Sequence, residues 1–342
     1  LLNQKNYISN AWGYIITAFA VAGPWIITII VLTGFSSLYS QEIRVSQDYQ
    51  LLNATIIYGF IGSQLITVPF QFFVTRYLAD EIYRERKEFL RPTFIGLGKI
   101  VLVLSFFVGT VIFIRGGLTF TYLAMAVYFF SMTSLVWISA FFLSTINEHF
   151  FLGKSFVIGG VIGFVVMFAF NQVVTVEQYP ITTSGLVLML SSMTAIFVAN
   201  TTKVLRTVEK TNKCQFDFLR GLSEYPSLFF IGILYIFGLW IDKFIMWNSA
   251  YGIEIFDFLY VNPPYDQSAF LSSLFIIPAN VLFLTVVEVY FIRYYKIFYD
   301  TTLIGTFDQI IRAKKEMRMR LFSNVFKIIL IQSLIIMFAF LF

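Results

Sequence analysis

The chain has 342 residues, of which 58% are apolar and only 13% are charged. Soluble domains are about 45–50% apolar and about 25% charged, so this composition excludes a soluble, disordered or fibrous protein and indicates a lipid bilayer. The formal net charge of +5 does not indicate a nucleic-acid partner, because basic residues also gather on the cytoplasmic side of membrane proteins.

Nine stretches of the sequence are long and apolar enough to span a membrane as helices. A spanning helix needs about 20 predominantly apolar residues to cross roughly 30 Å of hydrocarbon. The stretches lack the alternation of apolar and polar residues that barrel strands require, so the sequence predicts an all-α, polytopic membrane protein. In chain order, the predicted spans are residues 11–35, 53–78, 95–115, 118–145, 151–170, 181–201, 225–247, 269–291 and 322–342.

The connections between these spans alternate in their content of lysine and arginine. One alternate set of connections and span ends holds 21 of the 24 basic residues, and the other holds only Arg44 and Arg115. Because positive loops are retained in the cytoplasm, we expect a cytoplasmic N-terminus, with anionic membrane lipids near the basic set. The remaining basic residue, Lys243, lies inside a predicted span.

Two basic cytoplasmic segments, near residues 80–92 and 297–320, are predicted to be amphipathic helices. In the second segment, apolar residues recur every three or four positions, at Leu303, Phe307, Ile310, Ala313 and Met317. Two interpretations of this helix remain open: it lies on the inner leaflet, or it is a docking site for a cytoplasmic partner.

Residues that could support catalysis or bind a metal are few. The chain has one cysteine, Cys214, and one histidine, His149, which cannot build an intrachain disulfide, a redox pair or a conventional zinc site. We therefore expect no catalytic residue, no metal and no cofactor. Gly159 and Gly163 form a GxxxG pair in the fifth span, and this spacing predicts close packing against another helix.

The seventh span contains an acidic and a basic residue side by side, Asp242 and Lys243. Each costs about 2.5–3.5 kcal/mol at a bilayer centre, so both are expected to face a protein interior or a watery cavity. Helical spacing places Trp240, Lys243 and Trp247 on one face, with Asp242 about 100° away. The alternative is a location near the outer interface, where Lys243 extends toward water and the tryptophans anchor the helix.

The second span carries a polar stripe that suits the lining of a cavity. Gln64, Thr67 and Gln71 recur at i, i+3 and i+7 and therefore share a helical face, whereas Tyr58 is offset from Gln64 by about 240°. The eighth span adds three more polar residues, Asn280, Thr285 and Glu288.

Three spans contain an internal proline. Proline can kink a helix and free carbonyl groups that then line a cavity. The predicted kink positions are Pro24, Pro69 and Pro278.

Several of these segments together resemble a known family. AGPWIITI lies in the first span, with Gly23, Pro24 and Trp25, and TRYLADEIY lies where the second span ends. The seventh span contains GLWIDKFIMW, the eighth lies within YDQSAFLSSLFIIPANVLFLTVVEVYF, and YYKIFYDTTLIGTFDQI precedes the ninth. In order and topological placement these segments resemble the PelG-like Pel exopolysaccharide export proteins of the multidrug/oligosaccharidyl-lipid/polysaccharide exporter superfamily.

The resemblance implies a fold of about twelve helices in two six-helix lobes around a central cavity. Residues 1–202 are then expected to form the N-terminal lobe, 203–224 a basic cytoplasmic connection, and 225–342 part of the C-terminal lobe. On this interpretation the sequence is a portion of a longer chain, with further helices beyond Phe342 and a short piece before Leu1.

The resemblance also implies an inner-membrane transporter that exports a nascent, galactosamine-rich exopolysaccharide during biofilm matrix production. Its expected partners are the polysaccharide, a cytoplasmic glycosyltransferase and other membrane subunits of a synthase complex. Aromatic faces suit stacking on sugar rings, and acids suit the amine of a deacetylated sugar. The candidate translocation path therefore comprises Asp242, Lys243, Trp240, Trp247, Glu288, Gln64, Thr67, Gln71 and Asn280.

Three other functions remain open. A lipid-linked oligosaccharide flippase of the same superfamily would share the architecture, although the spans carry no mid-helix arginine for a pyrophosphate. A structural subunit that anchors a synthase would transport nothing itself. A membrane glycosyltransferase or polymerase would need a catalytic acid or arginines in sizeable outer connections, whose only arginines here are Arg44 and Arg115. Acids lie there without a partnered base or metal cluster: Glu42, Asp48, Glu254, Asp257 and Asp266.

Overall fold

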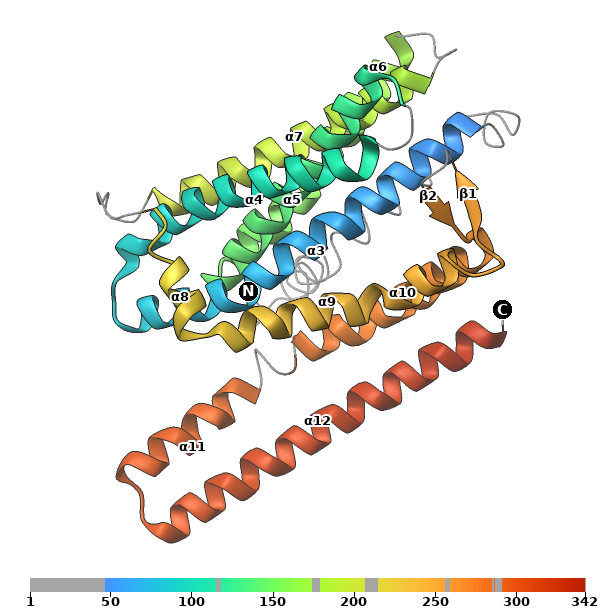
Figure 1. The fold of residues 1–342 in the computed structure, drawn as a ribbon. Coiled ribbons are helices and arrows are strands. Elements are labelled where there is room, and N and C mark those ends of the chain that lie inside the picture. The colour runs from blue at the N-terminus through green and yellow to red at the C-terminus, as the bar shows by residue number, and fades with distance from the viewer. Residues whose placement is uncertain are drawn as a thin grey trace. The chain divides into compact units, whose positions relative to one another are not determined.

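The computed structural model of the protein describes residues 47–114, 118–173, 179–206, 215–255, 259–284, 286 and 291–341. Within these residues the chain forms ten α-helices, one short 3-10 helix and one two-stranded sheet (Figure 1). The chain divides into two compact units after Asp266, and each is described by itself. The predicted first span, residues 11–35, and Pro24 lie outside the described residues.

The larger unit contains the described residues up to Asp266. Its elements are α3 (Gln47–Tyr83), η1 (Lys87–Phe89), α4 (Leu90–Phe113), α5 (Phe120–Thr145), α6 (His149–Val173), α7 (Tyr179–Leu205), α8 (Leu219–Glu224), α9 (Pro226–Trp247), β1 (Ile253–Ile255) and β2 (Leu259–Val261). The first turn of α10 (Pro263–Leu284) also belongs to this unit. The smaller unit contains the rest of α10 together with α11 (Ile292–Ile304) and α12 (Phe307–Leu341).

Eight of the described helices are long and apolar enough to cross a membrane, namely α3, α4, α5, α6, α7, α9, α10 and α12. Each overlaps one of the eight predicted spans that follow the first. The prediction of an all-α, polytopic membrane protein is therefore confirmed. The twelve-helix arrangement and the lobe boundaries stay predictions.

Neither of the two predicted amphipathic helices is a single helix. Between α3 and η1, Glu85 has a φ of 60°, a left-handed conformation that does not continue a right-handed helix. Between α11 and α12, Gly305 is extended, with a ψ of 161°. The second prediction therefore merged two helices, and the predicted ninth span is the C-terminal part of α12.

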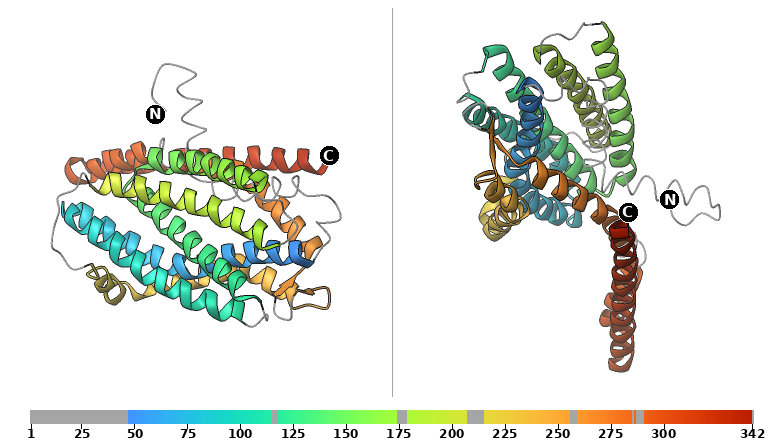
Figure 2. Two further views of the ribbon diagram at one scale, coloured as in Figure 1. Left: turned by 90° about the horizontal axis from the view of Figure 1, so that it is seen from above. Right: turned by 90° about the vertical axis from the view of Figure 1, so that its right-hand side faces the viewer.

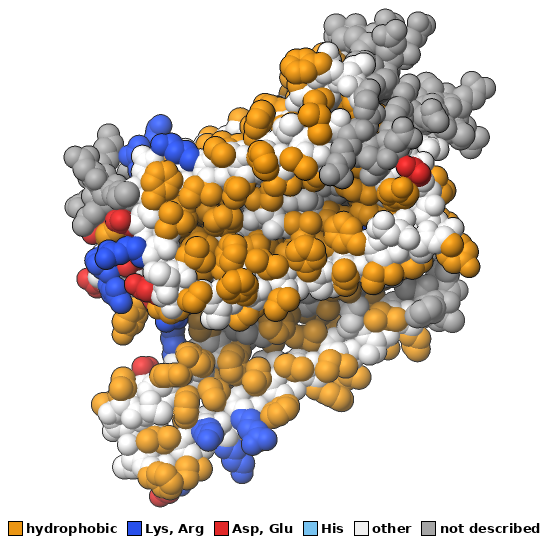
Figure 3. Space-filling view, in the orientation of Figure 1, with side chains coloured by type: hydrophobic (Ala, Val, Ile, Leu, Met, Phe, Trp, Pro, Cys, Tyr) orange, Lys and Arg blue, Asp and Glu red, His pale blue; other side chains and the backbone are white. Residues whose placement is uncertain are grey.

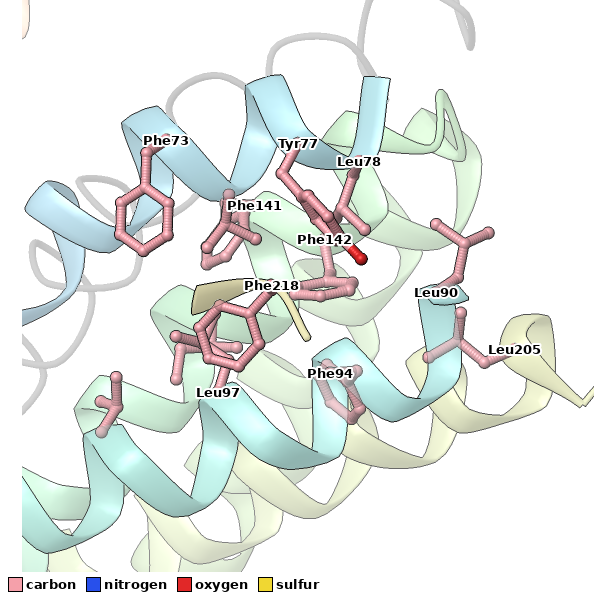
Figure 4. Close-up of a cluster of buried hydrophobic side chains, with 13 residues drawn as sticks. Phe73, Tyr77, Leu78, Leu90, Phe94, Leu97, Phe141, Phe142, Leu205 and Phe218 are labelled. Carbon is pink, nitrogen blue, oxygen red and sulfur yellow. The ribbon is translucent and has the colours of Figure 1, made fainter. Parts of the chain in front are cut away.

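α3 is the central helix of the larger unit, because it packs against α4, α5, α7, α8 and α9. A buried apolar cluster joins α3, α4, α5 and the residue before α8, around Phe73, Leu97, Phe142 and Phe218 (Figure 4). Lipid tails are as apolar as these side chains, so close packing contributes more than the hydrophobic effect to holding the helices together. The position of α9 beside α3 determines where the polar residues of the two helices meet.

Glycines permit the close approach of α6 and α7, which lie side by side (Figure 2). A Cβ atom at Gly163 would lie 2.8 Å from the carbonyl oxygen of Met189, and one at Gly159 would lie 3.2 Å from Cγ of Met193. Real Cβ atoms essentially never approach other heavy atoms to less than 3.0 Å. The close packing that the GxxxG pair predicts is confirmed.

Pro69 lies inside α3, which continues unbroken through it, and Pro278 likewise lies inside α10. The kinks predicted at these residues stay predictions. Pro69 does contact the neighbouring helix closely, because a Cβ atom at Gly232 of α9 would lie 2.8 Å from its Cα atom. Only a glycine therefore fits this crossing of α3 and α9.

The molecular surface shows broad apolar areas and separate groups of basic side chains (Figure 3). In the larger unit, Arg76 and Arg84, near the end of α3, have side chains that are 54% and 61% exposed. The apolar areas suit contact with lipid, and the basic groups suit a membrane face. The predicted cytoplasmic N-terminus stays a prediction.

We expect Gly232→Leu to destabilise the larger unit, because the new side chain would separate α9 from α3. Overpacking of this kind costs about 1–3 kcal/mol, and thermal unfolding in detergent would measure the loss. Gly238→Leu on the same helix is the matched control, since a Cβ atom there meets nothing within 4 Å. Equal melting temperatures for the two variants would contradict the packing described here.

Candidate functional site

Four elements of the larger unit meet where α9 ends: the end of α9, the β1–β2 hairpin, the first turn of α10 and the N-terminal half of α3. The strands pair antiparallel, with Glu254 opposite Tyr260. The hairpin thereby returns the chain from α9 to the start of α10. These strands were not predicted from the sequence.

The sequence that starts α10 fixes the position of its first turn. Asn262 precedes the helix, and its side-chain oxygen accepts a hydrogen bond from the backbone N–H of Tyr265 at 3.2 Å. Asparagine is a preferred N-cap, and Pro263 at the first helical position lacks only an N–H that would otherwise be unpaired. Asp266 then lies in the first turn, where the helix dipole favours a negative charge.

The carboxylate of Asp266 is the centre of a polar network that we call the Asp266 cluster, formed by Asp266, Lys243, Trp247, Asn262 and Tyr58. Lys243 Nζ lies 3.2 Å from Oδ1, and the side chains of this ion pair are only 13% and 14% exposed. Trp247 Nε1 donates to both carboxylate oxygens at 3.0 Å. The backbone N–H of Asn262 donates to Oδ2 at 3.1 Å.

Tyr58 connects the Asp266 cluster to α3 and to the hairpin. Its ring stacks on Trp247, with ring centroids 4.8 Å apart and an interplanar angle of 20°. Its hydroxyl donates to the carbonyl of Tyr260 at 2.9 Å and accepts from the backbone N–H of Tyr260 at 3.0 Å. One tyrosine on α3 thus joins strand β2 to the last residue of α9.

Asp242 has different surroundings from Asp266. It is exposed, and its Oδ2 accepts a hydrogen bond from the hydroxyl of Tyr265 at 2.5 Å. Lys243, its neighbour in sequence, points instead toward Asp266, and its ammonium lies 5.6 Å from the centroid of the Tyr265 ring. The charges of Asp242, Lys243 and Asp266 sum to −1, and Asp242 carries the most accessible of them.

The polar stripe of the second predicted span does not act as one group. Gln64 is 8% exposed, and its Oε1 accepts a hydrogen bond from Trp240 Nε1 at 2.9 Å. Thr67 is buried and donates to the carbonyl of Ser63 in its own helix at 2.9 Å. Gln71 is exposed. Only Gln64 therefore joins the residues predicted on α9.

The candidate residues of the eighth predicted span lie in the smaller unit or outside the described residues. Asn280 is an exposed residue of α10 in the smaller unit. Thr285 and Glu288 lie outside the described residues. Of the predicted path, the structure thus brings together Trp240 with Gln64, and Lys243 with Trp247, while Asp242 lies beside them.

Three residues near Lys243 were not included in the translocation path predicted from the sequence: Asp266, Tyr265 and Tyr58. Among the outer acids, Asp266 pairs with Lys243, a contact that was not predicted from the sequence. The interpretation of the tryptophans as interfacial anchors is wrong, since Trp240 and Trp247 are only 5% and 1% exposed. Asn262 and Pro263 before Asp266 were the available signal for a helix start.

The chemistry that the arrangement offers is hydrogen bonding, charge and an aromatic face. Among the described residues, no three or more His, Cys, Asp or Glu side chains group closely enough to hold a metal ion. Asp242 and Tyr265 present a carboxylate and an aromatic ring next to each other. These two groups suit recognition of a cation or a sugar ring.

Comparison with protein families gives a match over the whole chain. The family described as PelG: Putative exopolysaccharide Exporter (EPS-E) matches residues 1–342. Comparisons with curated proteins and with solved structures give no significant match.

We expect Asp266→Asn to destabilise the protein by about 2–3 kcal/mol, because it leaves the charge of Lys243 buried without a counter-charge. Asp242→Asn is the matched control and should be nearly neutral, since that carboxylate is exposed. Thermal unfolding of the purified protein measures both effects.

Combining Asp266→Asn with Lys243→Met should cost less than the sum of the single changes, because removal of both charges leaves neither one unpaired. Additive losses would show that the two side chains are not coupled.

Proposed function

We propose that this chain, which belongs to the PelG family of exopolysaccharide exporters, moves a nascent polysaccharide across the cytoplasmic membrane during biofilm matrix production. The whole-chain family match is the observation that carries the proposal, and the eight candidate spans support it. We further propose that the polymer is galactosamine-rich and partly deacetylated. A cytoplasmic glycosyltransferase and further membrane subunits of a synthase complex are its proposed partners.

The proposed orientation places the N-terminus in the cytoplasm of a multi-pass inner-membrane protein. Counting the predicted first span, α9 then runs outward, and the Asp266 cluster lies toward the outer end of the path. The gathering of basic residues in alternate connections supports this orientation. Polymer that has crossed most of the membrane would meet the hairpin and the start of α10.

Asp242 and Tyr265 are the proposed contacts with the polymer. Asp266 neutralises Lys243 at 3.2 Å, so Lys243 does not cancel the charge of Asp242. A net charge of −1 close to an aromatic ring favours a sugar that carries a free amine. Lys243, Trp240, Trp247 and Gln64 then act by holding the helices in place.

The other members of the predicted path stay candidates for polymer contact. Gln71 and Asn280 are exposed polar side chains on α3 and α10, and such amides can donate to and accept from sugar hydroxyls. Thr67 is a weaker candidate, because its hydroxyl already bonds within α3. Glu288 keeps its proposed role as a second acid for the amine.

We expect Asp242→Asn to lower polysaccharide export about tenfold, because a charge-assisted hydrogen bond contributes about 1.5–3 kcal/mol. Secreted polysaccharide, normalised to the amount of the protein in the membrane, measures the effect. Glu224→Gln is the matched control, since Glu224 is an exposed acid at the end of α8, away from the hairpin. Export at the normal level in Asp242→Asn would refute the role of this carboxylate.

A second experiment separates a transporter from a scaffold. Synthase complexes with and without this protein, reconstituted in proteoliposomes with sugar-nucleotide precursor outside, should differ in the polymer that reaches the lumen. We expect polymer in the lumen only when the protein is present, while total polymer synthesis stays at its normal level in both preparations. Lumenal polymer in equal amounts in its absence would identify the protein as a scaffold.

A further inference from the structure

The smaller unit contains a helical hairpin whose turn is tightly built. α11 packs against α12, and the two helices lie side by side in both views (Figures 1 and 2). At the turn, a Cβ atom on Gly305 would lie 2.5 Å from the carbonyl oxygen of Thr301. The backbone N–H of Thr306 donates to Oε1 of Gln309 at 2.9 Å, which is half of a capping box. The hairpin therefore has a defined tip.

A second contact joins the helices at the opposite end of the hairpin. The guanidinium of Arg320, on α12, lies 5.2 Å from the ring centroid of Tyr294, on α11. A cation–π contact of this kind contributes about 0.5–1 kcal/mol at an exposed site. The two helices are thus connected both at the turn and beyond it.

α12 is longer than a membrane is thick. Its 35 residues extend over about 52 Å, whereas the hydrocarbon core is about 30 Å thick. Residues 321–341 are predominantly apolar and suffice to span it, with Lys327 as the one charge. Residues 307–320 carry five basic and two acidic side chains and therefore lie outside the hydrocarbon.

The hairpin consequently stands out from the membrane. Residues 307–320 extend about 21 Å beyond the hydrocarbon, and α11 with 13 residues covers a similar length of about 20 Å. The headgroup layer on one side is only about 5–8 Å thick. Even a helix tilt of about 40° leaves the tip beyond the headgroups.

The tip is apolar although it lies in water. Leu303, Ile304 and Phe307 are 82%, 91% and 75% exposed. Exposed apolar groups beyond the reach of lipid, when surrounded by polar residues, mark protein interaction sites. This geometry favours the docking interpretation of the segment over a helix that lies on the inner leaflet.

Two exposed acids, Asp300 and Asp308, flank the tip, but basic side chains predominate along the two helices beyond it. Residues 292–320 contain seven basic and three acidic side chains, a net charge of +4. Arg312, Lys314 and Lys315 are exposed, and no ion pair joins them to another described residue. An acidic partner surface would complement these charges and would exclude basic surfaces.

We propose that the α11–α12 tip docks a cytoplasmic protein that offers an apolar pocket rimmed by acidic side chains. Ile304 and Phe307 enter the pocket, and Arg312, Lys314 and Lys315 face its rim. The placement of the hairpin in the cytoplasm rests on the proposed function and its orientation. The contact would hold the partner at the cytoplasmic face of the membrane.

The first test measures where the tip lies. A fluorophore is attached to Phe307→Cys in a Cys214→Ser background, with the full chain in nanodiscs of anionic lipid. We expect quenching by an aqueous quencher and not by lipid-borne quenchers. Leu334→Cys, within the apolar part of α12, is the control with the opposite expectation. Lipid quenching at position 307 would overturn the proposal in favour of membrane binding.

The second test identifies the partner. A photo-crosslinking amino acid replaces Ile304 in the full chain, in cells that make the polysaccharide, and mass spectrometry maps the crosslinked peptides. We expect one cytoplasmic protein, joined at apolar residues that acidic residues surround. Crosslinking that yields lipid adducts only, or no protein adduct, would overturn the proposal.

A matched pair of variants tests the acidic rim. Lys314→Gln with Lys315→Gln should lower the yield of crosslinked partner about tenfold. Arg293→Gln with Lys296→Gln removes the same amount of charge from the far end of α11 and should change this yield little. Equal effects would refute the role of the rim. Because crosslinking does not depend on export, a crosslink without export would refute the proposed function and leave the docking site intact.

Discussion

A lysine inside a membrane-spanning helix must find a counter-charge, and this requirement organises the end of the larger unit. Lys243 meets Asp266 at 3.2 Å, which removes much of the cost of burying a charge in lipid. The carboxylate also accepts from Trp247 and from the backbone of Asn262. The hairpin that separates α9 from α10 is therefore placed by an ion pair as well as by packing.

The same pairing gives two neighbouring carboxylates different roles. Asp266 has three donors around it and low exposure, so its capacity to bind a further ligand is largely used. Asp242 is exposed and is bonded by Tyr265. Lys243 turns away from Asp242 because Asp266 holds it. The proposed sugar contact thus depends on residues that never touch the sugar.

The spans were predictable because hydropathy reports directly on lipid contact. For the same reason, the charge of Lys243 inside an apolar span could be recognised as unusual. The partner of Lys243 was not predicted, because Asp266 lies 23 residues away across a hairpin that the sequence analysis read as an outer loop. Helical spacing alone also could not show which of Gln64, Thr67 and Gln71 contacts a neighbouring helix. Only the crossing of α9 over α3 singles out Gln64, through Trp240.

In the smaller unit, the periodicity of apolar residues did not reveal where one helix ends and the next begins. The apolar repeat of residues 297–320 continues across a turn, so the pattern alone predicted one helix where two exist. Local chemistry carried the missing information, since Gly305 is followed by Thr306 and, three residues later, Gln309, which together specify a helix end and a helix start. Capping signals therefore need to be read inside amphipathic stretches as well as at their ends.

In the proposed function, the pairing of Lys243 with Asp266 leaves the negative charge of Asp242 available to an amine. The most direct measurement compares the binding of partly deacetylated and fully acetylated galactosamine oligosaccharides to the purified protein and to Asp242→Asn. We expect preferential, salt-sensitive binding of the deacetylated oligosaccharide, and loss of that preference in the variant. Equal binding of both oligosaccharides to the unaltered protein, or an unchanged preference in Asp242→Asn, would contradict it.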